Sequence, residues 1–169
     1  GFDVASGMKN PTSGDLAVML NSVYAAQHPH HFSFAGHEVE TTGNPWAHVI
    51  LRGAVSKHGN STQNYHYEDI MRLIEKYDKM DVVNPAAINH SNSGKKYNEQ
   101  VRIAKEVMNN RQYSSDIKKM VKGLMIESYI EDGCQKVNEH VYGKSITDPC
   151  IGWATTERLI YDLAEMNQI

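Results

Sequence analysis

Short β-type runs alternate with amphipathic helical segments along the chain, and this alternation limits the possible folds more than any other feature. Apolar residues recur at helical spacing in four segments, 14–27, 67–79, 95–110 and 154–166. β-type runs precede these segments, at residues 3–9, 47–53, 84–90 and 121–128. The order predicts parallel βα units in an α/β fold, arranged either as a barrel or as an open doubly wound sheet.

One stretch, residues 31–46, interrupts this order. It begins with the β-rich run "HFSFAG" and continues with turn-forming residues in "HEVETTGNP". This pattern is typical of a hairpin that leaves the main sheet. Such a hairpin is a candidate for a regulatory site, but its residues specify no effector.

The composition is that of one ordinary globular domain, which we expect to cover residues 1–169. The chain is 40% hydrophobic and 22% charged, with a formal net charge of -3. It therefore lacks the excess of basic residues that would bind nucleic acids or anionic membranes. Because no apolar run approaches the roughly 20 residues of a membrane span, we expect a cytoplasmic protein with small-molecule partners. The spacing of Cys134 and Cys150 predicts reduced thiols and no metal motif.

Side chains of functional type follow the predicted strands at equivalent places. Lys9, Arg52, His90 and Glu127 each come where a β-type run ends, and Asn, Gly or Ser residues follow them closely. Parallel α/β folds carry their chemistry at the carboxyl ends of strands. We therefore expect these four side chains to share one site.

The residue types predict a metal beside an anion pocket. Histidine and glutamate bind divalent metals, whereas lysine and arginine bind phosphate or carboxylate groups. A third metal ligand is available in the loop "GKSITDPC", which contains Asp148. Taken singly, His90 would be an ordinary loop histidine and Asp148 a loop or capping residue. Together with Glu127 they suit an ion that keeps positions open for water or substrate.

Five motifs resemble a known family. The segments "GMKNPTSGDL", "HVILRG", "NHSNSGKKY", "LMIESY" and "YGKSITDPCIGW" look like the second half of class I 3-deoxy-D-arabino-heptulosonate 7-phosphate (DAHP) synthase. The resemblance implies the C-terminal half of a TIM (β/α)8 barrel, about four βα units. It also implies the first step of the shikimate pathway of aromatic amino acid biosynthesis, the condensation of phosphoenolpyruvate with erythrose 4-phosphate. Family members are oligomers that use a divalent metal ion (Mn, Fe, Co or Zn), and many are inhibited by an aromatic amino acid.

The resemblance also implies a role for each candidate residue. By matching motifs, Lys9 and Arg52 would hold the carboxylate and phosphate of phosphoenolpyruvate, and His90, Glu127 and Asp148 would bind the metal. Lys9 is also our candidate for a catalytic proton shuttle. These roles agree with the chemistry expected from the residue types alone.

Two departures from the family pattern affect what this chain can do. The family's metal-binding cysteine and its arginine-containing segments precede the matched region and are not in the sequence. Four parallel strands would leave two open sheet edges, so we expect a fragment with a missing N-terminal half or a homo-oligomer that closes the barrel. In addition, "NPAAINH" predicts a very short strand before His90, with Ala87 in place of the family's aspartate.

Three functional hypotheses follow. The first is a DAHP synthase-like enzyme, and the second is a catalytically inactive half-barrel remnant that acts as a binding or regulatory module. The third is a different phosphoenolpyruvate-using aldolase on the same architecture. "GKSITDPC" and "NHSNSGKK" fit the heptulosonate synthases better than their octulosonate relatives, which makes the third hypothesis the weakest.

Overall fold

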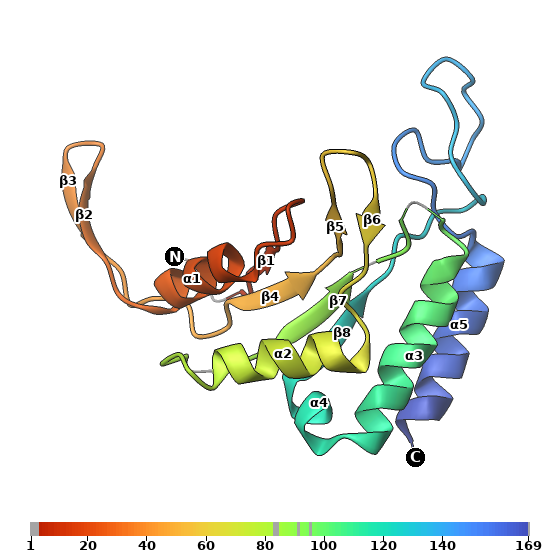
Figure 1. The fold of residues 1–169 in the computed structure, drawn as a ribbon. Coiled ribbons are helices and arrows are strands. Elements are labelled where there is room, and N and C mark those ends of the chain that lie inside the picture. The colour runs from red at the N-terminus through yellow and green to blue at the C-terminus, as the bar shows by residue number, and fades with distance from the viewer. Residues whose placement is uncertain (1–3, 83–84, 91, 95, 169) are drawn as a thin grey trace.

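A four-stranded parallel sheet forms the centre of the molecule (Figure 1). The computed structural model describes residues 4–82, 85–90, 92–94 and 96–168, and the side chains of Asn89 and His90 lie outside this description. The sheet has the order β1-β4-β7-β8. Its strands are β1 (Gly7–Lys9), β4 (His48–Leu51), β7 (Ala87–His90) and β8 (Val121–Met125). All neighbouring pairs are parallel, so the carboxyl ends of the strands meet at one edge, as the sequence predicts.

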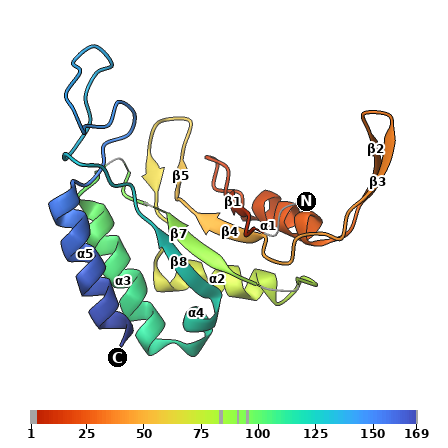
Figure 2. The same ribbon diagram turned by 180° about the vertical axis from the view of Figure 1, so that it is seen from behind.

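Five helices connect and flank these strands in the described part of the chain. They are α1 (Leu16–Gln27), α2 (Tyr67–Tyr77), α3 (Glu99–Tyr113), α4 (Ser115–Met120) and α5 (Trp153–Asn167). The Asp15 side chain accepts a hydrogen bond from the backbone N–H of Ala17 at 2.8 Å and so caps the start of α1. Helix α2 lies in front of the sheet in Figure 1 and behind it in Figure 2, while α3 and α5 pack side by side beyond β8.

The core lies between the helices and one face of the sheet. Val49, Ile50 and Leu51 of β4 are all buried, as expected for a strand inside a parallel sheet. One hydrophobic cluster joins β4 and β7 to α1 and α2, and it includes Met19, Leu20, Val23, Val49, Leu51, Leu73, Tyr77 and Ala87. A second cluster joins α2, α3 and α4 to β8, and it includes Ile70, Ile103, Val107, Ile117 and Val121. These clusters fix the sheet, and with it the positions of the strand ends.

Two antiparallel hairpins leave the central sheet. The expected one is formed by β2 (His31–Phe34) and β3 (His37–Glu40), and it projects away from the body of the molecule (Figure 1). The other, β5 (Ala54–Val55) with β6 (Ser61–Thr62), follows β4 directly and is not predicted from the sequence. Each of its strands has two residues, which is too short for an alternating pattern to reveal.

The strand before His90 is short, as the sequence predicts, and its pairing is irregular. Ala87 pairs with Val121, but Ile88 pairs with Gly123, so β8 contributes one extra residue between these two pairs. This is the geometry of a β-bulge, which locally bends a strand. The irregularity lies three residues before the end of β7 and near the expected site.

Two expectations from composition can also be compared with the structure. Cys134 and Cys150 are free thiols, as predicted. In the described part of the chain, no helix is both long enough and apolar enough to cross a membrane.

Candidate active site at the carboxyl ends of the strands

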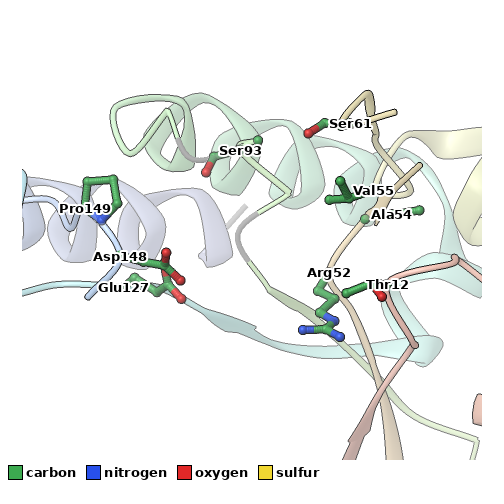
Figure 3. Close-up of a pocket in the computed structure, with 12 residues that line it drawn as sticks. Thr12, Arg52, Ala54, Val55, Ser61, Ser93, Glu127, Asp148 and Pro149 are labelled. Atoms are coloured by element: carbon green, nitrogen blue, oxygen red, sulfur yellow. The ribbon is translucent and has the colours of Figure 1, made fainter. Parts of the chain in front are cut away.

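A pocket of about 380 Å³ opens where the parallel strands end (Figure 3). Three of the five predicted site residues line it: Arg52 directly after β4, Glu127 shortly after β8, and Asp148 in the loop before α5. The remaining wall comes from Thr12, the β5–β6 hairpin and Ser93 with Gly94 beyond β7. Segments far apart in the sequence therefore meet at this end of the sheet, as parallel topology requires.

The other two predicted residues are placed differently. Lys9 is the last residue of β1 and pairs with Ile50, but its exposed side chain is not among the residues that line the pocket. The backbone of His90 ends β7 and pairs with Met125. Its side chain lies outside the described part of the structure. The roles expected for both residues therefore stay predictions.

Arg52 is the cationic group of the pocket. Its side chain is half-buried, and its Nε–H donates a hydrogen bond to the backbone carbonyl of Asn10 at 2.8 Å. Among the described residues, neither terminal amino group of Arg52 has a hydrogen-bond partner. The guanidinium therefore keeps the paired donors that bind a phosphate or carboxylate in bidentate fashion.

Two carboxylates occupy the opposite side of the pocket. In the view of Figure 3 the Glu127 and Asp148 side chains lie toward one side of the pocket and Arg52 lies toward the other. Their charge also acts on a neighbouring thiol. Burial raises the pKa of Cys150, a hydrogen bond with Ser145 lowers it, and the negative charges of Glu127 and Asp148 raise it further. The pocket thus has an anionic side suited to a cation and a cationic side suited to an anion.

The donor set fits a divalent metal as far as it is described. Carboxylate oxygens are suitable ligands for Mn and Fe, and an imidazole at position 90 would add the nitrogen donor common at such sites. Within the described side chains, no group of three histidine, cysteine, aspartate or glutamate residues has the geometry of a metal site. The two neighbouring carboxylates therefore form the described part of a candidate site that the His90 side chain would complete.

Buried Gln100 fixes the backbone of Glu127. The Gln100 side chain, on α3, accepts a hydrogen bond from the Glu127 N–H at 2.7 Å and donates one to the Glu127 carbonyl at 3.1 Å. Gln100 is only 3% exposed, so both bonds are shielded from water. Its amide satisfies both peptide groups of Glu127, as a neighbouring strand would. This places the start of the Glu127 side chain without constraining its carboxylate.

Replacing Gln100 by alanine should lower the free energy of unfolding by about 2 kcal/mol, because two hydrogen bonds of a buried side chain are lost and the Glu127 N–H loses its partner, although the Glu127 carbonyl keeps its bond from the Ile151 N–H. Urea denaturation followed by circular dichroism would measure this difference. Gln112→Ala is the matched control, since Gln112 lies on the same helix but is exposed, and its loss should cost less than about 0.5 kcal/mol. Equal effects of the two substitutions would contradict the role given to Gln100.

The comparisons with known proteins bear on this site. The sequence profile of the DAHP synthetase I family matches residues 2–160. The chain belongs to this family. A phospho-2-dehydro-3-deoxyheptonate aldolase of Haemophilus influenzae is 35% identical over 98% of the chain, and a Trp-sensitive one of Enterobacter agglomerans is 36% identical over 94%. The chain covers 46% of each relative, so it spans about half their length.

A solved structure shows the same backbone arrangement within the family. The phospho-2-dehydro-3-deoxyheptonate aldolase of Francisella tularensis SCHU S4 superposes with a TM-score of 0.85 at 31% sequence identity. The superposition covers 99% of this chain and 49% of that one. Membership of the DAHP synthetase I family confirms the resemblance drawn from the five sequence motifs, including its restriction to part of the family's length.

Sequence reasoning missed the buried and half-buried amides that support the site of this DAHP synthetase I chain. They are Asn10, Asn64, Asn92 and Gln100. Asn10 directly follows a predicted strand end, Asn92 comes two residues after another, and Gln100 falls within an apolar helical pattern. Gln100 could have been identified by one signal, a polar amide at a position where the helical pattern predicts a core-facing residue.

Proposed function

We propose that this chain supplies part of the active site of a DAHP synthase, which condenses phosphoenolpyruvate with erythrose 4-phosphate in aromatic amino acid biosynthesis. The observation that carries the proposal is the pocket in which Arg52 faces Glu127 and Asp148 at the carboxyl ends of a parallel sheet. Family membership adds the reaction class. The names of these relatives describe an aldolase of a phosphorylated heptonate, which is consistent with this reaction.

The proposed reaction uses the two sides of the pocket separately. Carbon 3 of phosphoenolpyruvate attacks the aldehyde carbon of erythrose 4-phosphate, water adds at carbon 2, and the bond from carbon 2 to the phosphate oxygen breaks. Arg52 binds the phosphate through its terminal amino groups and offsets its negative charge. Lys9 would hold the carboxylate of the same substrate and carry a proton on its Nζ.

His90, Glu127 and Asp148 would hold the divalent metal, and these ligand types suit Mn, Fe, Co or Zn. When bound, such an ion polarises the aldehyde oxygen and favours attack at the aldehyde carbon. Glu127 and Asp148 also keep this side of the pocket negative, so that the anionic substrate binds on the Arg52 side.

The proposed architecture is a single partial TIM-barrel domain over residues 1–169, the C-terminal half of a (β/α)8 barrel. The four-stranded sheet ends at β1 and β8, and the chain covers about half the length of its relatives. A missing N-terminal half or a second copy of the chain would pair with these edges. A cytoplasmic location belongs to the same proposal.

The Arg52 side of the pocket also fits one alternative, a catalytically inactive half-barrel that binds a phosphorylated acid as a regulatory module. Anion binding without turnover would be the property of such a module.

Consumption of phosphoenolpyruvate by the purified chain tests the proposal. It should require erythrose 4-phosphate, should increase with added Mn²⁺ and should stop with a chelator, since the aldehyde needs a bound metal. Omission of erythrose 4-phosphate is the matched control for nonspecific hydrolysis. A chain that keeps its circular dichroism spectrum but consumes no phosphoenolpyruvate would contradict activity of this chain and favour the binding module.

A further inference from the structure

Three asparagines from separate loops meet around the Arg52–Gly53 segment. Asn10 follows β1, Asn64 precedes α2, and Asn92 follows β7. Asn10 is 0% exposed and Asn92 is 3% exposed, which is unusual for asparagine. Buried amides of this kind are retained only where hydrogen bonds compensate for the loss of water.

Both side-chain amide atoms of Asn10 form hydrogen bonds with this segment or with residues next to it. Its Oδ1 accepts hydrogen bonds from the Arg52 backbone N–H at 3.0 Å and from Asn64 Nδ2 at 3.2 Å. Its Nδ2 donates to the carbonyls of Gly53 at 2.7 Å and Pro11 at 3.0 Å. These bonds use the two donors and two acceptor positions of the side chain. The Asn10 backbone carbonyl receives the Arg52 Nε–H as well.

Asn64 and Asn92 complete the network from the other side. Asn64 Oδ1 accepts from the Gly53 N–H at 2.8 Å, and the Asn64 backbone N–H donates to Asn92 Oδ1 at 3.0 Å. Asn92 Nδ2 donates to the Leu51 carbonyl at 3.3 Å. The peptide groups on both sides of Arg52 are therefore held by amide side chains.

Gly53 lets the network approach this closely. A Cβ atom at this position would lie 2.7 Å from Asn92 Oδ1 and 2.9 Å from the Thr62 carbonyl oxygen, and the φ angle of Gly53 is +78°. Only glycine adopts such a backbone angle readily and leaves this space empty. The segment after β4 is thus built for close contact with the asparagines.

We propose that Asn10, Asn64 and Asn92 are positioning residues that hold the Arg52 guanidinium in the orientation that binds the phosphate of the substrate. This inference rests on the proposed function of Arg52. An arginine has several rotatable bonds, and ordering it on binding costs conformational entropy. Fixing its backbone and Nε–H in advance removes part of this cost while leaving the terminal amino groups for the ligand.

A double-mutant cycle tests the inference. Asn64 is only half-buried, so Asn64→Ala disturbs the network less than a change at Asn10 would. With phosphoenolpyruvate as the probe in isothermal titration calorimetry, Asn64→Ala should raise the dissociation constant about fivefold, the equivalent of one hydrogen bond. In the Arg52→Ala background, the same substitution should change it less than about twofold, because the group that it positions is gone.

Asn44→Ala is the matched control. Asn44 is also half-buried, donates to the Val4 carbonyl at 3.0 Å and accepts from the Trp46 N–H at 3.0 Å, but it lies before β4 at the opposite end of the strand. Its loss should leave the dissociation constant unchanged. Asn64→Ser, which keeps a hydroxyl group at the position, is made in parallel in case the alanine variant does not fold. An unchanged dissociation constant, or the same change in both Arg52 backgrounds, would overturn the inference.

A second readout separates this inference from the proposed function. The Nε–H signal of Arg52 in ¹⁵N NMR spectra, assigned by its loss in Arg52→Ala, should exchange slowly with water in the unsubstituted chain and at least about fivefold faster in Asn64→Ala. This measurement needs no ligand. If the chain binds no phosphoenolpyruvate but the exchange rate changes as expected, the proposed function fails and the positioning role stands. Equal exchange rates in both proteins would overturn the positioning role.

Discussion

Glu127→Ala lowers the affinity of the chain for Mn²⁺ by about 100-fold or more, which is the largest effect expected of any single substitution at the site. Loss of a residue that only orients a metal ligand typically lowers metal affinity 10- to 100-fold. Loss of a direct ligand should lower the affinity by the upper end of that range or more. Glu127 also lies next to Asp148 in the pocket, so its removal takes away one of the two described carboxylates (Figure 3).

Titration of Mn²⁺ into the protein, with the free ion followed by electron paramagnetic resonance, measures this affinity. Glu131→Ala is the matched control because Glu131 is an exposed glutamate in the same loop and is not among the residues that line the pocket. The affinity of the Glu131→Ala variant for Mn²⁺ should stay within about twofold of that of the unsubstituted chain, since exposed charges act weakly at a distance. Unchanged Mn²⁺ binding in Glu127→Ala would remove Glu127 from the proposed metal site.

The second large effect is expected at Arg52. Arg52→Ala should raise the dissociation constant for phosphoenolpyruvate about 100-fold, because a bidentate arginine forms two charge-assisted hydrogen bonds with a phosphate or carboxylate group. Arg52→Lys should recover only part of this loss. Lysine keeps the charge but lacks the planar pair of donors.

Calorimetric titration of phosphoenolpyruvate distinguishes this role from a general effect of positive charge. Arg72→Ala removes an exposed arginine of α2 that lies 3.8 Å from Asp69, so the net charge changes by the same amount as in Arg52→Ala. The control should alter the dissociation constant less than about twofold. Equal losses in Arg52→Ala and Arg72→Ala would show that binding follows net charge and does not use a specific site.

The regular part of the fold could be predicted because its signal is repeated along the sequence. The helices around Leu20, Ile74, Ala104 and Leu159 show apolar spacing over many residues, and the strands ending near Arg52 and Glu127 are apolar throughout. Helix α4 and the β5–β6 hairpin could not be predicted in this way. Their elements have six residues or fewer, and their positions depend on the sheet and helices around them.

The site could be predicted only in part. Topology brings Arg52, Glu127 and Asp148 to one pocket, as their places after strands and before α5 indicate. Lys9 ends its strand as expected, yet the pocket wall is formed by other residues, because the loop after β1 and the hairpin after β4 occupy that side. The supporting amides were invisible to local reasoning. Asn10 and Asn64 are 54 residues apart in the sequence, and no local pattern records such a contact.

The asparagine network implies that the Arg52 side of the pocket is a self-contained unit. Every described support of Arg52 comes from loops next to β1, β4 and β7, and none comes from beyond the sheet edge at β1. Another strand that pairs with the sheet edge could therefore add groups near Arg52, but it would not be needed to hold Arg52 in place. In an assembly of two separately produced halves, this half would bring the supports of Arg52 already formed.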